Sequence, residues 1–262
     1  MSQNSYTISE LMACIFAREI KEGELGGCPG VRSEVPLASV RLAQMMHAPN
    51  VDCYYGAIVY NAHGPLSKFA TEYDRIIRAE ASVATYEWFD TLHRGDLDFF
   101  FIGGLQIDMY GNVNLVCLGD WKRPTLRGPG SAGLNSVTFA RRHFVWINEH
   151  ASRVFAPKVD FISCPGYLDG PGARERAGLQ WGGPALVVSP LGVMDFDPET
   201  KRMRLRSVHA GVTVEEIVKN TGFELIIPAN VPETMEPSDE ELRILRTIVD
   251  PVGILRNEEP VG

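Results

Sequence analysis

The sequence predicts an α/β fold, with an open, mostly parallel sheet covered by helices on both faces. Short apolar runs typical of buried strands alternate along the chain with segments whose apolar residues recur at helical spacing. With 262 residues, 45% of them hydrophobic, the chain can bury a sizeable core. No internal repeat, low-complexity tract or linker divides it, so we expect residues 1–262 to form a single domain.

The first predicted element is a helix that begins at a capping box. Thr7 and Glu10 have the required spacing, apolar residues follow at helical spacing, and Gly23 is expected to end the helix. The next elements in the N-terminal half are expected to be a loop at Gly26, Gly27 and Gly30, a helix from Pro36 to about Met46, a strand at Val51–Tyr55, a helix at Ala79–Leu92 and a strand at Asp98–Phe101.

The second half begins with residues 119–135, which are rich in glycine and proline and show no clear periodicity. The strands expected after this stretch are Phe144–Ile147, Val159–Ser163, Ala185–Val188 and a hairpin of Val193–Phe196 with Met203–Val208 around Asp197–Thr200. Two further capping boxes, Thr213 with Glu216 and Ser238 with Glu241, predict helices that end at Gly222 and Pro251.

Composition narrows the classes of function. The net charge of −8 argues against nucleic acid and against an anionic membrane surface as partners. We expect no transmembrane helix and no signal peptide, because no apolar run is long enough and the N-terminus lacks a basic segment with an apolar core. Five scattered cysteines without a Cys-x-x-Cys pair suggest neither a zinc site, nor any other metal site, nor a disulfide framework, and a reducing cytoplasm is the simplest setting.

The most informative segment is Ile102–Asn114. A strand runs directly into Gly103-Gly104, where the lack of Cβ atoms lets a ligand approach the main chain, at the kind of strand end where open α/β sheets bind ligands. Asp108–Asn112 then predicts a tight turn into a second strand, Val113–Cys117. On spacing alone, a hairpin without any ligand explains these glycines equally well.

Three ordered segments also carry a family resemblance. Gly103–Asn114, Ser163–Arg176 and Thr221–Glu224 resemble signature segments of the β-subunits of class I CoA-transferases, in the glutaconate CoA-transferase branch. Ser207–Thr213, with the tail after it, is more similar to a sister group, the β-subunit of the steroid ring-cleaving CoA-dependent hydrolase. The resemblance extends over nearly the whole chain.

This resemblance implies the CoA-transferase (NagB/RpiA-like) fold. It also implies a homologous α-subunit as partner, in an αβ or α2β2 assembly, and an acyl-CoA substrate. Coenzyme A would then be part of the substrate, and no separate cofactor is expected.

The catalytic glutamate of the transferases is missing from its expected place. In the family, this residue acts as a nucleophile and forms covalent acyl intermediates. It follows a strand that begins near an Ala-Pro-(Asp/Asn) sequence, which here is Ala48–Asn50, and Gly56 occupies the expected position. A shift in alignment would instead bring forward Asp52 or Cys53, although a buried packing thiol is the commoner role for such a cysteine.

Two groups of residues are candidates for contacting the substrate. Gln106 is placed to donate to a thioester oxygen beside Gly103 and Gly104, whereas Asp108 is expected to brace the turn. Tyr55 is a candidate pocket residue. Neighbouring aromatic and histidine residues could line the same pocket or belong to the core; they are Tyr54, Tyr60 and His63.

The loop from Arg127 to Gly133 is the second candidate region. Its backbone N–H groups, with Gly128 and Gly130, could bind an oxyanion or phosphate, and Arg127 could pair with a carboxylate. A flexible loop with a solvated arginine is the alternative, and in the family the equivalent loop borders the acyl-CoA site. Structural or solvated roles are expected for Arg174–Arg176, His143, His150 and His209, with a subunit contact as the alternative for the arginine segment.

These observations predict a CoA-transferase-family enzyme subunit that has changed its reaction. Because the glutamate is absent, we expect hydrolytic carbon–carbon cleavage of a cyclic CoA thioester, as the resemblance to the steroid-degrading hydrolase implies, with an acidic residue from the α-subunit. The alternatives are a CoA-transferase for a dicarboxylic acid such as glutaconate, with another carboxylate as nucleophile, and a non-catalytic subunit that stabilises its partner.

Overall fold

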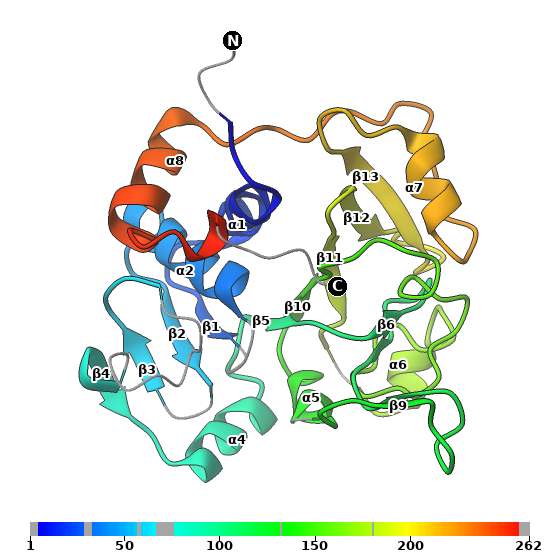
Figure 1. The fold of residues 1–262 in the computed structure, drawn as a ribbon. Helices are drawn as coiled ribbons and strands as arrows, with labels where there is room; N and C mark the ends of the chain where they lie inside the picture. Colours follow the sequence, from blue (N-terminus) through cyan, green and yellow to red (C-terminus); the bar gives the residue numbers. More distant parts are fainter. Residues whose placement is uncertain are drawn as a thin grey trace. The chain divides into compact units, whose positions relative to one another are not determined.

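The computed structural model describes residues 5–28, 33–56, 59–66, 76–131, 133–179 and 181–256, and Gly30 of the predicted loop lies outside these ranges. The chain forms two compact units (Figure 1). The first contains residues 1–91, 96–99 and 235–262, and the second contains residues 92–95 and 100–234. Among the described residues, no helix is long and apolar enough to cross a membrane.

The first unit contains strands in the order β1-β2-β3-β4. Strands β1 and β2 are parallel, whereas β2–β3 and β3–β4 are antiparallel. Its elements are α1 (Ile8–Glu19), β1 (Leu25–Cys28), α2 (Glu34–Met46), β2 (Asp52–Tyr55), β3 (Val59–Ala62), β4 (Ala79–Ser82), α4 (Thr85–His93, whose last two residues belong to the second unit), α8 (Asp239–Ile244), the π-helix η1 (Leu245–Val249) and the 3₁₀-helix η2 (Ile254–Arg256).

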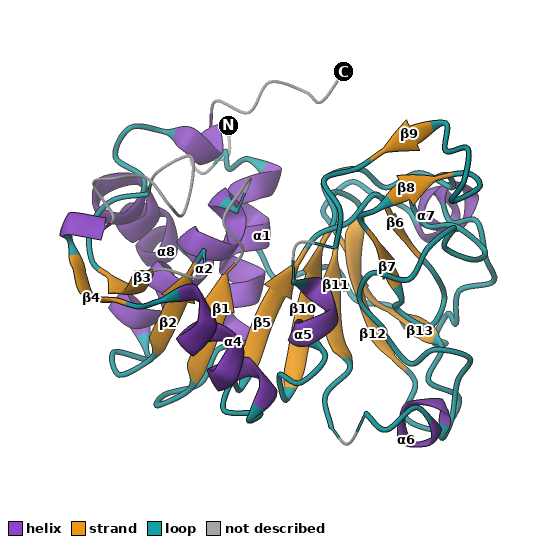
Figure 2. Ribbon diagram, turned by 90° about the horizontal axis from the view of Figure 1, so that it is seen from below, coloured by secondary structure: helices purple, strands orange, loops and turns teal. Residues whose placement is uncertain are grey.

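Helices cover both faces of this sheet, with α1, α2 and α8 on one side and α4 on the other (Figure 2). The capping boxes at Thr7 and Ser238 are both present. Arg18 binds Glu241 at 2.6 Å, and Arg246 binds the nearly buried carboxylate of Glu10 at 2.8 Å. The C-terminal segment is therefore attached to the first helix by two ion pairs.

The second unit is a larger sheet with two short hairpins. Its strands have the order β13-β12-β11-β10-β5; β10–β11 is parallel, while β11–β12 and β12–β13 are antiparallel. Its elements are β5 (Phe99–Ile102), β6 (Gln106–Ile107), β7 (Val113–Asn114), β8 (Cys117–Leu118), β9 (Leu126–Arg127), α5 (Leu134–Val137), β10 (Arg142–Trp146), α6 (Ala173–Arg176), β11 (Pro184–Val188), β12 (Gly192–Phe196), β13 (Met203–Val208) and α7 (Val214–Asn220). The hairpins are β6–β7 and β8–β9.

Two of the predicted elements in the first unit are wrong. Gly26 and Gly27 are not in a loop but in buried strand β1, where a Cβ on Gly26 would lie 2.1 Å from the Phe99 ring. Residues 79–82 form strand β4 instead of the start of a helix, because they pair with β3, and only α4 is helical.

Two predicted strands in the second unit also differ. Val159–Ser163 is not a strand. The Asp160 amide donates to the side-chain Oε1 of Gln106 and the Ser163 amide to the carbonyl of Val113, and an isolated bridge between Cys164 and Val113 is the contact that the described residues form with β7 there. The stretch Val113–Cys117 is divided between β7 and β8, because the Asn114 side chain accepts the amide of Val116 and interrupts the ladder.

Candidate functional site

Gly103 and Gly104 follow β5 as predicted. Packing against other residues of this protein is sufficient to explain why both positions are glycine. Neither has a left-handed φ. A Cβ on Gly103 would lie 3.0 Å from the Trp146 ring, and one on Gly104 would lie 2.4 Å from Cγ1 of Val113. Close packing therefore leaves no room for a side chain at Gly104 and little at Gly103, and contact with a ligand there stays a prediction.

Gln106 is buried and its amide is used within the protein. Its Nε2 donates to Oδ2 of Asp160 at 3.1 Å, while its Oε1 accepts from Nδ2 of Asn114 at 2.7 Å and from the Asp160 amide at 3.0 Å. Asp160 Oδ2 also accepts the amide of Gly119. Gln106 thus positions the segment before β8, and donation to a substrate oxygen would have to use its second amide hydrogen.

The turn after β6 is fixed by a buried polar pair. Oδ1 of Asp108 accepts the backbone amides of Tyr110 and Asn112, at 3.0 and 3.1 Å, so Asp108 braces the turn as expected. Oδ1 of Asn112 accepts the amides of Gly166 and Leu168. These bonds join two of the three segments that carry the family resemblance.

The second candidate loop begins at β9. Arg127 is exposed, and its Nη2 lies 3.4 Å from the carbonyl oxygen of Trp121. Gly128 packs against the carbonyl of Leu115, where a Cβ would lie 2.4 Å away. Gly130 has a φ of +97° and open space around its missing Cβ, so the loop backbone is accessible there.

Arg174 differs most from expectation. Its side chain is only 5% exposed, so it is neither solvated nor open to contact with another subunit. Its guanidinium donates to four carbonyl oxygens, those of Pro165, Gly166, Thr138 and Trp181, at 2.7–3.2 Å. The sequence contains one weak indication that Arg174 binds carbonyl oxygens. Many glycines and prolines surround it, and the carbonyl groups in such irregular segments are not used by helices or sheets and need other donors.

Two groups near Arg174 have shifted pKa values. Burial, assisted by the Arg174 charge, lowers the pKa of His143 to about 3. Burial raises the pKa of the Cys164 thiol to about 12. Neither ring nitrogen of buried His143 has a hydrogen-bond partner among the described residues. Both side chains therefore stay neutral near pH 7 and act as packing groups.

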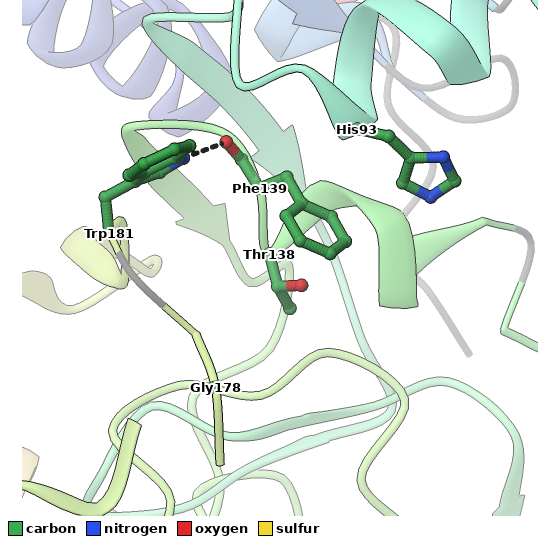
Figure 3. Close-up of a pocket in the computed structure, with 5 residues that line it drawn as sticks. All are labelled: His93, Thr138, Phe139, Gly178 and Trp181. Carbon is green, nitrogen blue, oxygen red and sulfur yellow. Dashed lines mark hydrogen bonds between the residues drawn. The ribbon is translucent and has the colours of Figure 1, made fainter. Parts of the chain in front are cut away.

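A small cavity of about 240 Å³ lies in the same unit, lined by His93, Thr138, Phe139, Gly178 and Trp181 (Figure 3). His93 and Phe139 meet edge to face at 5.2 Å, and Nε1 of Trp181 donates to the carbonyl of Phe139. The cavity is smaller than the roughly 300–1,000 Å³ usual for ligand pockets, so it cannot hold a whole acyl-CoA.

In the first unit, Gly56 directly follows strand β2. Its amide donates to the carbonyl of Cys28 at 3.1 Å, and its φ is +61°. Tyr55 before it is fully buried and belongs to the core, as does Cys53, whose Sγ lies 3.7 Å from that of Cys28. Asp52 begins the same strand, so about 13 Å of extended chain separates it from Gly56.

Asp52 belongs to a polar cluster on β2, β3 and β4. It accepts from Tyr60 at 2.6 Å and from Asn61 at 2.8 Å, and Asn61 also donates to Glu80. His63 pairs with Glu80 at 2.8 Å. Asn61 has a φ of +50° and was not singled out from the sequence. In this cluster Asp52 acts as a structural hydrogen-bond acceptor, and it lies away from Gly56.

Comparison with known proteins identifies the family. A family model described as coenzyme A transferase matches residues 67–220. The chain belongs to the coenzyme A transferase family. Its described residues contain no group of three His, Cys, Asp or Glu side chains that could hold a metal ion.

Two relatives of this coenzyme A transferase family member match most of its length. A glutaconate CoA-transferase subunit from Acidaminococcus fermentans is 32% identical over 260 residues, 94% of each chain. The cholesterol ring-cleaving hydrolase IpdB subunit of Rhodococcus jostii is 31% identical over 245 residues, 91% of this chain and 90% of the relative. Both are named as subunits, as the sequence led us to expect.

Solved structures confirm the predicted fold. The chain matches the crystal structure of glutaconate coenzyme A-transferase from Acidaminococcus fermentans with a TM-score of 0.89 and 28% identity, over 97% of this chain and 99% of that one. It matches Rhodococcus jostii IpdAB with a TM-score of 0.81 and 28% identity, over 98% and 100%. The open α/β CoA-transferase fold is therefore shown.

Proposed function

We propose that this chain is the β-subunit of a heteromeric enzyme that hydrolyses a carbon–carbon bond in a cyclic CoA thioester, of the kind met in steroid ring degradation. The observation that carries the proposal is Gly56, which stands where a transferase glutamate is expected. Its φ of +61° suits glycine and would strain a glutamate. Similarity to the cholesterol ring-cleaving hydrolase subunit supports the same reaction.

The reaction needs no covalent enzyme intermediate. Water adds to a ring carbonyl carbon of a β-dicarbonyl-type substrate, and the bond between that carbon and its neighbour breaks. The electron pair stays on the neighbouring carbon, is stabilised by the adjacent carbonyl group, and takes a proton. The product keeps its thioester and gains a carboxylate. Coenzyme A enters as part of the substrate, and no other cofactor is required.

The chain is proposed to work only with a homologous α-subunit, as αβ or α2β2. Both relatives carry subunit names, which supports such an assembly. We assign the acidic residue that activates water to the α-subunit, because Gly56, which follows β2, has no side chain. We place the enzyme in a reducing cytoplasm, since all five cysteines are buried and none of them forms a disulfide.

One observation favours a second candidate, a CoA-transferase for a dicarboxylic acid such as glutaconate. The chain matches the glutaconate CoA-transferase structure with a higher TM-score than it matches IpdAB. That reaction would need another carboxylate as nucleophile. A third candidate, a non-catalytic subunit, predicts an α-subunit that turns over alone.

The test is to co-express the chain with a homologous α-subunit and to assay cyclic β-dicarbonyl CoA thioesters without an acceptor acid. We expect ring-opened CoA thioester from the complex and no turnover from either subunit alone. Hydroxylamine or borohydride added with substrate should leave the mass of this chain unchanged. A trapped adduct on Asp52 or Cys53, with CoA transfer to an added dicarboxylate, would establish the transferase instead.

A further inference from the structure

The hairpin of β8 and β9 carries an exposed aromatic platform. Trp121 is 53% exposed and stacks on Phe161, with ring centroids 5.1 Å apart and planes 25° from parallel. The guanidinium carbon of Arg127 lies 4.8 Å from the centroid of the Trp121 ring. An ordered ring with such neighbours, but half open to solvent, is suited to joining a stack with a further flat group.

The same hairpin concentrates positive charge on an acidic protein. Residues 121–127 contain Lys122, Arg123 and Arg127 and no aspartate or glutamate, although the whole chain has a net charge of −8. All three side chains are exposed, and none forms an ion pair within the described part of the chain. The nearest acids along the chain and across the stack, Asp120 and Asp160, accept backbone amides instead.

The loop that presents these groups is already ordered. Oδ1 of Asp120 accepts the amides of Lys122 and Arg123, at 2.8 and 3.3 Å, and the Thr125 amide returns to the carbonyl of Leu118 at 2.9 Å. Gly119, at a φ of +81°, is held by Asp160. Preorganisation of this kind lowers the entropy that a ligand must remove on binding.

We propose that the Trp121 platform and the cations Lys122, Arg123 and Arg127 bind the 3′-phosphorylated adenine nucleotide end of the acyl-CoA. The adenine ring extends the stack of Phe161, Trp121 and Arg127, and the phosphates bind the cations. This assignment rests on the proposed function for the identity of the ligand, and it gives Arg127 a phosphate or base contact rather than an acyl carboxylate.

A plain protein–protein contact fits the hairpin less well. Charged residues are depleted at the centres of such interfaces, whereas this ring is surrounded by three cations. Aromatic stacking combined with exposed lysine and arginine is the usual way of holding a nucleotide through its base and its phosphates.

The test measures binding of adenosine 3′,5′-bisphosphate, which has neither pantetheine nor acyl group, to the full chain in its α-subunit complex by calorimetry. Trp121→Ala should raise the dissociation constant about tenfold, as expected for loss of base stacking, while Trp121→Phe keeps most of the affinity. Arg123→Ala should weaken CoA more than dephospho-CoA, and added salt should reduce this difference.

Two matched controls accompany these variants. Leu126→Ala removes another exposed apolar side chain of the hairpin, and Arg153→Ala removes an exposed arginine that pairs with Glu149 instead. Neither should change the dissociation constant for the bisphosphate. Unchanged affinity in Trp121→Ala, or equal effects of Arg123→Ala and Arg153→Ala, would overturn the assignment.

Failure of this assignment and failure of the proposed function give different results. Nucleotide binding that depends on Trp121 in a complex without ring-cleaving activity would keep the site and reject the reaction. Ring cleavage with a nucleotide affinity that does not depend on Trp121 would keep the proposed reaction and reject the nucleotide site. Loss of the α-subunit from Trp121→Ala, with nucleotide affinity of the chain intact, would identify the hairpin as a subunit contact and reject the nucleotide site.

Discussion

The side-chain amide nitrogen of Asn112 donates to both carboxylate oxygens of Asp108, at 3.1 and 2.9 Å. The same nitrogen donates to the carbonyl of Leu168, so one buried amide joins the turn after β6 to the Gly166–Leu168 segment. Both side chains are at most 4% exposed, and water cannot replace these bonds readily.

Asn112→Ala should therefore destabilise the protein strongly. It removes five hydrogen-bond contacts and leaves the buried Asp108 carboxylate short of donors, which we expect to lower the free energy of unfolding by about 3 kcal/mol. Urea unfolding of the complex measures this. Asn220→Ala is the control, because Asn220 makes one exposed bond to the Glu216 carbonyl. A loss no larger than in the control would show that the pair does not hold the turn.

Gly104→Ala should overpack the second unit. Its Cβ would lie 2.4 Å from Cγ1 of Val113 and 3.0 Å from the carbonyl oxygen of Asn114, and such overpacking costs about 1–3 kcal/mol. The double variant Gly104→Ala, Val113→Ala should recover part of that loss in a double-mutant cycle, since it removes the nearer obstacle. Strict additivity of the two single effects would contradict this account.

Arg174→Lys should be far more damaging than Arg176→Lys. Lysine cannot reproduce four bonds from a planar fork, so buried carbonyls lose their donors, and we expect a loss of about 3 kcal/mol or more. Arg176 is exposed on the same helix and should tolerate lysine within about 0.5 kcal/mol. Thermal or urea unfolding of the two variants gives the comparison. Equal stabilities would show that the four hydrogen bonds of Arg174 do not stabilise the fold.

His150 and His209 should make the protein sensitive to mild acid. Nδ1 of His150 lies 2.7 Å from the hydroxyl of Ser189, and its Nε2 lies 3.0 Å from that of Thr221, which itself donates to a carbonyl. Burial lowers the pKa of His150 to about 4, with a smaller contribution from the neighbouring His209. Burial also lowers the pKa of His209.

Between pH 6.5 and about 4 the unfolded chain binds more protons than the folded one at His150, so stability falls as the pH falls. The stabilisation is fully present above pH 6.5, and His150 alone accounts for about 3 kcal/mol by pH 4. Urea unfolding at several pH values measures the slope. His150→Gln should flatten it, and an unchanged slope in that variant would assign the acid sensitivity to other groups.

The sequence was sufficient where local chemistry decides the structure. The capping residues Thr7, Thr213 and Ser238 each accept the amide three residues on, and the hairpin around Asp197 forms as expected. It was insufficient where pairing overrides propensity. Residues 79–82 favour a helix but pair with β3. Gly26 lies in a strand because β1 pairs with β2, and it is a glycine because the Phe99 ring leaves no room for a side chain.

The candidate site shows the same division. The Gly103–Asn114 segment and the tight turn at Asp108 are visible in the sequence. The distant partners are not: Asp160 of Gln106 lies 54 residues away, and Gly166 and Leu168 of Asn112 lie 54 and 56 residues away, beyond the reach of local spacing. Arg174 was misjudged because three adjacent charged residues are typical of a solvated surface. Only the tertiary fold brings four carbonyl oxygens to its guanidinium.

All four acceptors of Arg174 are main-chain oxygens, which every amino acid supplies. Substitutions at residues 138, 165 and 181 therefore leave the acceptors in place as long as the backbone path is kept, while nearly any change at residue 174 removes the donors. Gly166 is the exception, because a Cβ there would lie 2.3 Å from the main chain of Gly111. One side chain, that of Arg174, supplies every donor of this junction, so Thr138, Pro165 and Trp181 can be exchanged without removing an acceptor from it.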